Sequence, residues 1–556
     1  MFKLHLPTLV FSVLLTGIIM PLPASALSDE ENQPGFLVVA MDRGALGNKE
    51  VEEVFERFGH EYPAALTFTG WEEDKYKPYF IASLKELKAK RVKRVVIIPM
   101  IVSRHDPYFE KMEKTVNAAI DEVFGPDSGR FLTDPIGESY LFDQILYDRI
   151  AAVSKEPEQE RLVVVGLGAV NVEQADRIKQ ELDTLLNRTR HFWKFKEVAS
   201  AVYFYPHAEQ SVRDSENEKI LQLITKTAAK KGETIVIPMI IGRKTDSAMS
   251  FLNRFRTMLS ELDLTLHGED LIHHESVLIW LKKTANMLTP VQPGEIGVVL
   301  MPHGADKPWN DTVERTIEPL KDRYPVEIAY GMADYSSIQD AVSRLEAKGI
   351  KHIIFGRMYA LPENMKAESD YILGLTRELA DHNHHKEDYR QLRTSMIFTS
   401  FGGYEEDPEI ASALLYRVDE MSHDPSDETI LLLSHGSGDD QVNERWLALM
   451  LRNAEQMKLI SRNKFRSIKV AALREDWPDK MEASLQEIKK IIENGNHHGR
   501  VIIIPDRLAG SGPYQRVLKD MSYDLSPNGI APHPFVTHWL EREIQKAINN
   551  LSMSLE

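Results

Sequence analysis

The sequence contains no cysteine among its 556 residues. The chain therefore has no disulfide, no thiolate metal site and no lipid attached to a cysteine. It also lacks a glycine-rich phosphate loop, a dinucleotide-binding fingerprint and a G-x-S-x-G nucleophile elbow after any expected strand. We therefore expect no organic cofactor.

Basic residues are too few to balance the acidic ones, and the formal net charge is −17. An acidic chain is a poor electrostatic match for nucleic acid or for anionic lipid, so neither is expected as a partner. The composition, 43% hydrophobic and 27% charged, is that of a globular protein.

The one long apolar run near the N-terminus, Leu6 to Met20, is short for a membrane-spanning helix. It follows Lys3 and precedes an A-x-A cleavage pattern that ends at Ala26. We interpret residues 1–26 as a secretory signal peptide, with an uncleaved anchor as the alternative. No later run reaches membrane-spanning length. The mature protein is expected to be exported, periplasmic or extracellular, without stable insertion in a membrane.

Short apolar runs rich in branched residues recur four times, and each is followed by a helical pattern. A second run, such as "VVIIP" or "VIIIP", recurs later in each repeat, and each repeat closes on a turn and an amphipathic helix. Continuous apolar strands that alternate with amphipathic helices predict parallel sheets covered on both faces. The first runs begin at Gly35, Arg161, Glu295 and Thr429.

We therefore predict an α/β fold of four tandem units, each a small parallel sheet flanked by helices. The units span roughly residues 35–155, 160–286, 295–420 and 428–550. The segment from Thr289 to Glu295 is the best candidate for a boundary between two halves. The sequence leaves open which units pair with each other.

Histidines stand where two predicted first strands end. "LLLSHGSGDD" (Leu431–Asp440) carries His435, and "VVLMPHGADK" (Val298–Lys307) carries His303. Ligands of open α/β sheets bind beyond the carboxyl ends of strands. A role in binding or catalysis is therefore one interpretation of these histidines. The other is a strand-end histidine that hydrogen-bonds the loop backbone.

The combination of "LLLSHGSGDDQVNERW", "VIIIPDRLAGSGPYQ" and "GIAPHPFVTHWLEREI" resembles the class II tetrapyrrole chelatases, of the sirohydrochlorin cobalt/iron chelatase type. "VVIIPMIVSRHDPYFEKM" with "DPIGESYLFDQILYDRI" is the next best match. The likeness lies in the order and spacing of motifs over nearly all of the mature chain. It implies flavodoxin-like units that pair around a cleft. It also implies insertion of a divalent metal, cobalt, iron or nickel, into a tetrapyrrole.

The resemblance further implies two active-site histidines, one after the first strand and one in the loop after the fourth. The first position corresponds to His435 and His303, and the second to His105. These three are the expected catalytic residues and metal ligands. No unit keeps both histidines, and in the first unit Arg43 stands where the first is expected.

Metal insertion needs a loosely held ion and a base for two pyrrole protons, and imidazole with a neighbouring carboxylate provides both. Glu475 in "LREDWPD" is the predicted catalytic acid in the fourth unit. Glu72 or Glu73 and Asp334 follow strands in comparable places. An exposed loop acid is the alternative interpretation of each.

A macrocycle rich in carboxylates calls for arginine side chains. Four arginines in loops after the later strands are the predicted substrate-binding residues, and loop-closing salt bridges are the alternative. Two follow strand-end prolines, Pro99 and Pro238, by five residues. The other two follow Phe355 and Pro505 by two. They are Arg104, Arg243, Arg357 and Arg507.

Three functions remain open at this point. The chain is an exported chelatase acting on a sirohydrochlorin-like tetrapyrrole, a non-catalytic metal- or tetrapyrrole-binding protein derived from one, or a structural scaffold. The retained His-Gly turns and arginines favour the first. The separated histidines and the expected export favour the second. The metal, the macrocycle and the oligomeric state are not determined by the sequence.

Overall fold

The computed structural model describes residues 33–242, 250–379 and 390–553. Within these ranges the chain forms four parallel sheets of four strands, each ordered second, first, third, fourth along the chain. The predicted α/β fold class with four helix-flanked parallel sheets is confirmed. The proposed signal peptide and Arg243 lie outside the described residues.

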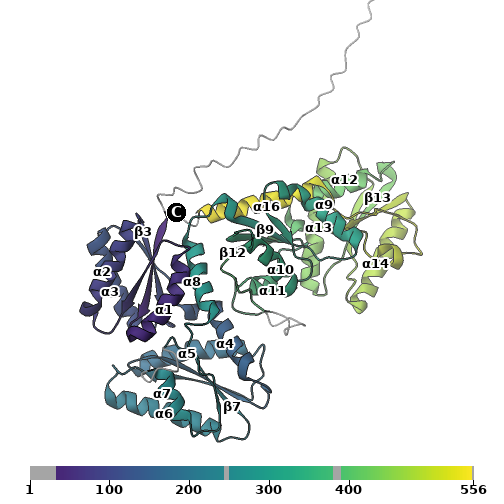
Figure 1. Cartoon of the computed structure of the whole chain (residues 1–556). Coiled ribbons are helices and arrows are strands. Elements are labelled where there is room, and N and C mark those ends of the chain that lie inside the picture. Colours follow the sequence, from purple (N-terminus) through teal and green to yellow (C-terminus); the bar gives the residue numbers. More distant parts are fainter. Residues whose placement is uncertain (1–32, 243–249, 380–389, 554–556) are drawn as a thin grey trace, which may run out of the picture.

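Strands and helices alternate strictly in the first two units (Figure 1). The first contains β1 (Pro34–Met41), α1 (Gly44–Gly59), β2 (Ala64–Thr69), α2 (Glu73–Ala89), β3 (Arg94–Met100), α3 (Pro107–Phe124), β4 (Gly129–Leu132) and α4 (Tyr140–Val153). The second contains β5 (Arg161–Ala169), α5 (Val172–Thr189), β6 (Glu197–Phe204), α6 (Gln210–Ala228), β7 (Thr234–Pro238), α7 (Phe251–Leu259), β8 (Thr265–Leu266) and α8 (Glu275–Leu288).

The last two units repeat this order. The third contains β9 (Ile296–Met301), α9 (Lys307–Ile317), β10 (Val326–Ile328), α10 (Tyr335–Glu346), β11 (His352–Arg357), α11 (Lys366–Ile372), β12 (Ile397–Gly402) and α12 (Ile410–Asp419). The fourth contains β13 (Glu428–Ser434), α13 (Asp440–Ile460), β14 (Ser467–Ala472), α14 (Pro478–Asn496), β15 (Arg500–Asp506), α15 (Tyr514–Val517), β16 (Asp524–Leu525) and α16 (Pro534–Met553). The first and third strands of each unit are central and buried on both faces, which explains their unbroken apolar sequences.

Neighbouring units exchange their closing helices. Helix α4 of the first unit contacts β7 of the second, and α8 of the second contacts α1 and β3 of the first. Likewise α12 contacts β15, and α16 contacts β11 and β12. One hydrophobic core therefore joins the first unit to the second, and another joins the third to the fourth. The units pair as one with two and three with four.

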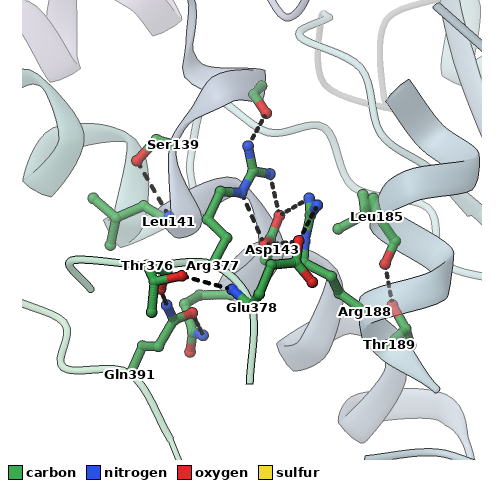
Figure 2. A network of polar contacts seen from close by, with 12 residues as sticks. Ser139, Leu141, Asp143, Leu185, Arg188, Thr189, Thr376, Arg377, Glu378 and Gln391 are labelled. Carbon is green, nitrogen blue, oxygen red and sulfur yellow. Dashed lines mark hydrogen bonds and ion pairs between the residues drawn. The ribbon is translucent and has the colours of Figure 1, made fainter. Parts of the chain in front are cut away.

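The two pairs are joined by a polar junction that involves three units (Figure 2). Asp143 on α4 is fully buried and accepts from the Nε atoms of Arg188 on α5 (2.9 Å) and Arg377 of the third unit (3.1 Å). Each arginine also donates from Nη2 to the other carboxylate oxygen. Nearby, the Tyr140 hydroxyl donates to the carbonyl of Leu392 at 2.9 Å. The third unit is thus anchored to both units of the first pair.

Among the described residues, no helix combines the length and apolar character needed to cross a membrane.

Candidate functional site

The turn after the first strand is built alike in the third and fourth units. Gly304 and Gly436 have φ of 82° and 81°, a region that suits glycine because it lacks a Cβ atom. Each preceding histidine turns its ring onto that glycine's carbonyl, with Nδ1 to oxygen distances of 2.7 Å for His303 and 2.8 Å for His435. A carbonyl only accepts, so Nδ1 carries the hydrogen in both rings, and Nε2 of His303 is left for a ligand.

The acidic residue that follows each of these turns is a helix cap. Asp306 accepts from the backbone N–H of Trp309 at 3.1 Å, and Asp439 accepts from that of Val442 at 2.9 Å. Each satisfies an N–H group that the first turn of a helix leaves free. Both turns therefore combine a His-Gly pair with an aspartate that caps the next helix, three residues after His303 and four residues after His435.

In the fourth unit, side chains from three neighbouring strand ends converge on His435. Its Nε2 lies 3.0 Å from Oδ2 of Asp476 and 3.6 Å from Oε1 of Glu475. Arg507, after β15, forms an ion pair with the same Glu475 oxygen. The strand order β14-β13-β15 brings these residues together, because the carboxyl ends of parallel strands meet at one edge of the sheet.

This cluster, which we call the His435 site, is open to solvent. The side chains of His435, Glu475 and Asp476 are 29%, 14% and 69% exposed. The Trp477 ring lies edge-on to the imidazole, with centroids 5.9 Å apart. The imidazole can give its Nε2 lone pair to a divalent ion, and the carboxylates can accept a proton. In the described ranges, no group of three or more histidine, aspartate and glutamate side chains is arranged to hold a metal ion.

The other predicted acids do not lie beside a histidine. Asp334 caps α10 by accepting from the N–H of Ser337 at 2.7 Å. Glu73 forms an ion pair with Lys114 at 3.0 Å. Glu475 is the predicted acid that meets a predicted histidine. Among the described residues, the exposed His303 forms no hydrogen bond or ion pair with an acid.

His105 lies in the first pair, in the loop between β3 and α3. It follows the third strand of its unit, whereas the resemblance implies a loop after the fourth. Its Nε2 is 3.8 Å from Oε1 of Glu181 on α5 of the second unit. Burial lowers the pKa of His105, with further lowering by Arg177 and Arg104. Burial raises the pKa of Glu181.

A cavity of about 170 Å³ lies beside this loop at the boundary of the first and second units. Arg377 of the third unit closes one side of it. Its polar lining consists of Ser103, Asp106, Glu138, Glu181, Thr184, Arg188 and Arg377. The volume is below the roughly 300 Å³ at which sites for drug-sized ligands begin, so a tetrapyrrole does not fit inside it.

In the second pair, the units face each other reciprocally. The Trp309 indole on α9 donates to the carbonyl of Ala509 in the loop after β15, at 3.0 Å. In the other direction, Arg445 on α13 forms an ion pair with Glu363 in the loop after β11. Each first-strand turn thus lies on the side that meets the partner unit's third-strand loop. His303 and His435 therefore both lie on the side of their units that faces this interface, and His105 belongs to the other pair.

The strand register corrects one predicted equivalence. Leu433 pairs with Pro505, and Met301 pairs with Arg357. Leu433 and Met301 each lie two residues before the turn histidine, so Arg357 corresponds to Pro505. The prediction that Arg357 and Arg507 share a position is wrong. Arg357 ends a strand, whereas Arg507 begins a loop.

A second correction concerns the first unit. Val39 pairs with Pro99 in the way that Leu433 pairs with Pro505. Counting two residues on from Val39 gives Met41, not Arg43. The expectation that Arg43 stands at the first-histidine position is therefore wrong by two residues, and a thioether occupies it.

The predicted substrate-binding arginines that the structure describes all have carboxylate partners within their own units. Arg104 pairs with Asp134 and Glu138, and Arg507 pairs with Glu475. The Arg357 side chain is 3% exposed, 3.6 Å from Asp370, and burial lowers its pKa. Arg104 and Arg507 remain accessible to a ligand, and Arg357 does not.

Sequence reasoning did not single out Asp476, Trp477 or Glu181. Asp476 and Trp477 directly follow Glu475 in "LREDWPD". They could have been identified if the position of each loop residue relative to the end of the strand had been known. Glu181 lies on a helix, opposite a loop of another unit. No spacing within the sequence points to such a contact.

The sequence matches no protein-family model and no curated protein. Solved structures with a similar fold include the sirohydrochlorin chelatase SirB from Bacillus subtilis subspecies spizizenii in complex with cobalt (15% identity, TM-score 0.32, covering 44% of this chain and 91% of that one). SirB from Bacillus subtilis with Fe³⁺ is also similar (14% identity, TM-score 0.35, covering 45% of this chain and 92% of that one). A third is a multi-domain protein from Deinococcus radiodurans described as structurally similar to chelatases (15% identity, TM-score 0.32, covering 45% of this chain and 54% of that one). The chain spans about half the length of that protein, 54%.

Proposed function

We propose that this protein is an exported chelatase that inserts a divalent metal, cobalt or iron, into a sirohydrochlorin-like tetrapyrrole. The observation that carries the proposal is the His435 site. Its imidazole is oriented through Nδ1, its Nε2 is 3.0 Å from a carboxylate, and it lies at the open edge of the sheet.

The reaction forms bonds from the metal to the pyrrole nitrogens, and the two pyrrole protons leave to bases. His435 is the proposed metal ligand. Its hydrogen-bonded Nδ1 fixes the ring, and the ion would replace the hydrogen through which Nε2 contacts Asp476. Glu475 and Asp476 are the proposed proton acceptors. Arg507 holds Glu475 and leaves further N–H donors for a substrate carboxylate. His303 and His105 are proposed as ligands in clefts of their own, and Arg104 as a second contact for substrate carboxylates.

A second candidate, a non-catalytic tetrapyrrole- or metal-binding protein, is favoured by one specific observation. Among the described residues, no hydrogen bond or ion pair joins any two of His105, His303 and His435. A site with a single histidine can hold an ion or a metallated macrocycle without accelerating insertion.

The test is to mix the mature chain with sirohydrochlorin and Co²⁺ under anaerobic conditions and to follow the visible spectrum. A chelatase accelerates conversion to the metallated spectrum, and His435→Ala lowers that rate by about 10²–10⁴-fold. His303→Ala and His105→Ala measure the contribution of the other clefts. His498→Ala, at an exposed turn histidine, is the matched control and keeps the wild-type rate.

A shifted spectrum without acceleration over the uncatalysed reaction identifies the binding protein instead. An unchanged spectrum with every macrocycle and metal tried rejects both candidates. Export is tested separately, by sequencing the N-terminus of the protein recovered from the cell exterior or periplasm; a new terminus at Leu27 is expected.

A further inference from the structure

Two buried carboxyl groups meet at the interface between the third and fourth units. Glu405 belongs to the 3₁₀ turn Tyr404–Glu406 of the third unit, and Asp506 is the last residue of β15 in the fourth. Their relative exposures are 0% and 1%. The two side chains lie within hydrogen-bonding reach of each other. They are not part of the His435 site.

The polar surroundings of this pair are incomplete. Oε2 of Glu405 accepts from the Asn453 amide on α13 at 2.9 Å. The other Glu405 oxygen and both Asp506 oxygens have no hydrogen-bond partner among the described residues. A buried carboxylate without a donor is unfavourable enough to offset much of the stability of a domain. The interface therefore needs a donor at this point.

A proton is the donor that fits. Two ionised carboxylates only accept, so they repel, whereas one proton turns the contact into an O–H···O hydrogen bond. Burial raises the pKa of both groups, and for Glu405 the neighbouring Asp506 raises it further. We propose that Glu405 and Asp506 form a proton-binding site that locks the third unit to the fourth. This inference stands apart from the proposed function.

The groups that face the pair do not replace the proton. The Trp446 indole N–H lies within hydrogen-bonding reach of Glu405 and lowers its pKa, but both Asp506 oxygens still have no donor among the described residues. Tyr404 and Tyr514 are buried phenols whose pKa values burial raises above the ordinary range, so both stay neutral. Arg507 pairs with Glu475 and has no hydrogen bond to either carboxyl group of the pair, and Arg452 donates to the backbone carbonyl of Glu405 rather than to its carboxyl.

The sign of the pH effect follows from linkage. The pKa of the pair is higher in the folded protein than in the unfolded chain, whose carboxyl groups titrate at about pH 4. The stabilisation is complete below that pH and is lost as the pH rises through the raised pKa of the folded pair. The lock therefore closes on acidification and loosens on alkalinisation. The pair lies next to the strand ends that carry the His435 site, since Asp506 precedes Arg507, and Ser434, its register partner, precedes His435.

The experiment measures hydrogen exchange in α13 and in the Tyr404–Glu406 turn of the full chain from about pH 5 to about pH 9, corrected for intrinsic exchange. Wild type is expected to lose protection there as the pH rises. Glu405→Gln supplies a permanent amide donor to Asp506 and should keep its protection over the whole range. Asp506→Asn, its mirror image, should do the same. Glu406→Gln, at the exposed neighbour on the same turn, should follow wild type.

Flat protection in wild type overturns the proposal whatever the variants do. So does a Glu405→Gln profile that still falls with pH as wild type does. If one amide variant fails to fold, the other and the wild-type profile still decide the matter.

Discussion

The imidazole Nε2 of His435 lies 3.0 Å from the carboxylate of Asp476, a residue only one position beyond the acid expected from the sequence. This contact places a proton acceptor beside the proposed metal ligand. Because Asp476 is 69% exposed, its carboxylate remains in contact with solvent and can pass a proton on.

Asp476→Asn tests that role. We expect turnover to fall by about 10–100-fold, as for the loss of a group that orients a metal-binding histidine, and to fall less than in His435→Ala. Asp479→Asn removes the same charge from the first turn of α14 and should leave turnover unchanged. If Asp476→Asn and Asp479→Asn lower turnover equally, Asp476 acts only through the general surface charge and not through its contact with His435.

Asp143→Ala tests the junction of three units. The substitution removes the carboxylate that two arginines share, and the buried Arg188 keeps only a 3.5 Å contact with the exposed Glu378. It is expected to lower the free energy of unfolding by about 3–5 kcal/mol. Urea denaturation measures this. Asp134→Ala, which breaks an exposed ion pair with Arg104, should cost no more than about 1 kcal/mol. Similar costs for the two variants would contradict the role of Asp143 as an anchor.

Substitution by methionine should have different effects at Arg357 and at Arg507. Arg357→Met fills a buried site with an apolar side chain, and Asp370 keeps Lys366 as an ion-pair partner. Stability should stay the same or rise, and tetrapyrrole affinity should not change. Arg507→Met should weaken affinity by about 10- to 150-fold, because a charged hydrogen bond is worth about 1.5–3 kcal/mol. Titration of both variants with sirohydrochlorin checks this, and a loss of affinity in Arg357→Met would restore it as a binding residue.

Lys283 should make stability depend on pH. Burial lowers its pKa to about 7 in the folded protein, where its Nζ donates to the carbonyl of Met396. The unfolded chain holds the proton up to about pH 10.4, so the unfolding free energy should rise with pH between these values. Lys283→Met should flatten that rise in urea titrations. Lys282→Met, which loses an ion pair with Glu61, should retain it.

The fold could be predicted because each strand is a continuous apolar run and each closing helix repeats. Much of the His435 site could be predicted too, since Glu475 and Arg507 follow strands that neighbour β13 in the sheet. The alignment of Arg357 with Arg507 failed because the third unit has no proline at the strand position of Pro505. The contact between Asp143 and Arg377 joins residues 234 positions apart and leaves no periodic pattern in the sequence.

The exchanged closing helices have a consequence for how such a chain can arise. A unit that lends its last helix to a neighbour leaves its own sheet uncovered, so a protein of one such unit must associate with a second copy. Tandem duplication turns that association into an intramolecular one, at an effective concentration that a connecting segment sets at about the millimolar level. Each copy is then free to diverge, because its neighbour can no longer dissociate. Histidines could be lost from one turn and retained in another without loss of the fold.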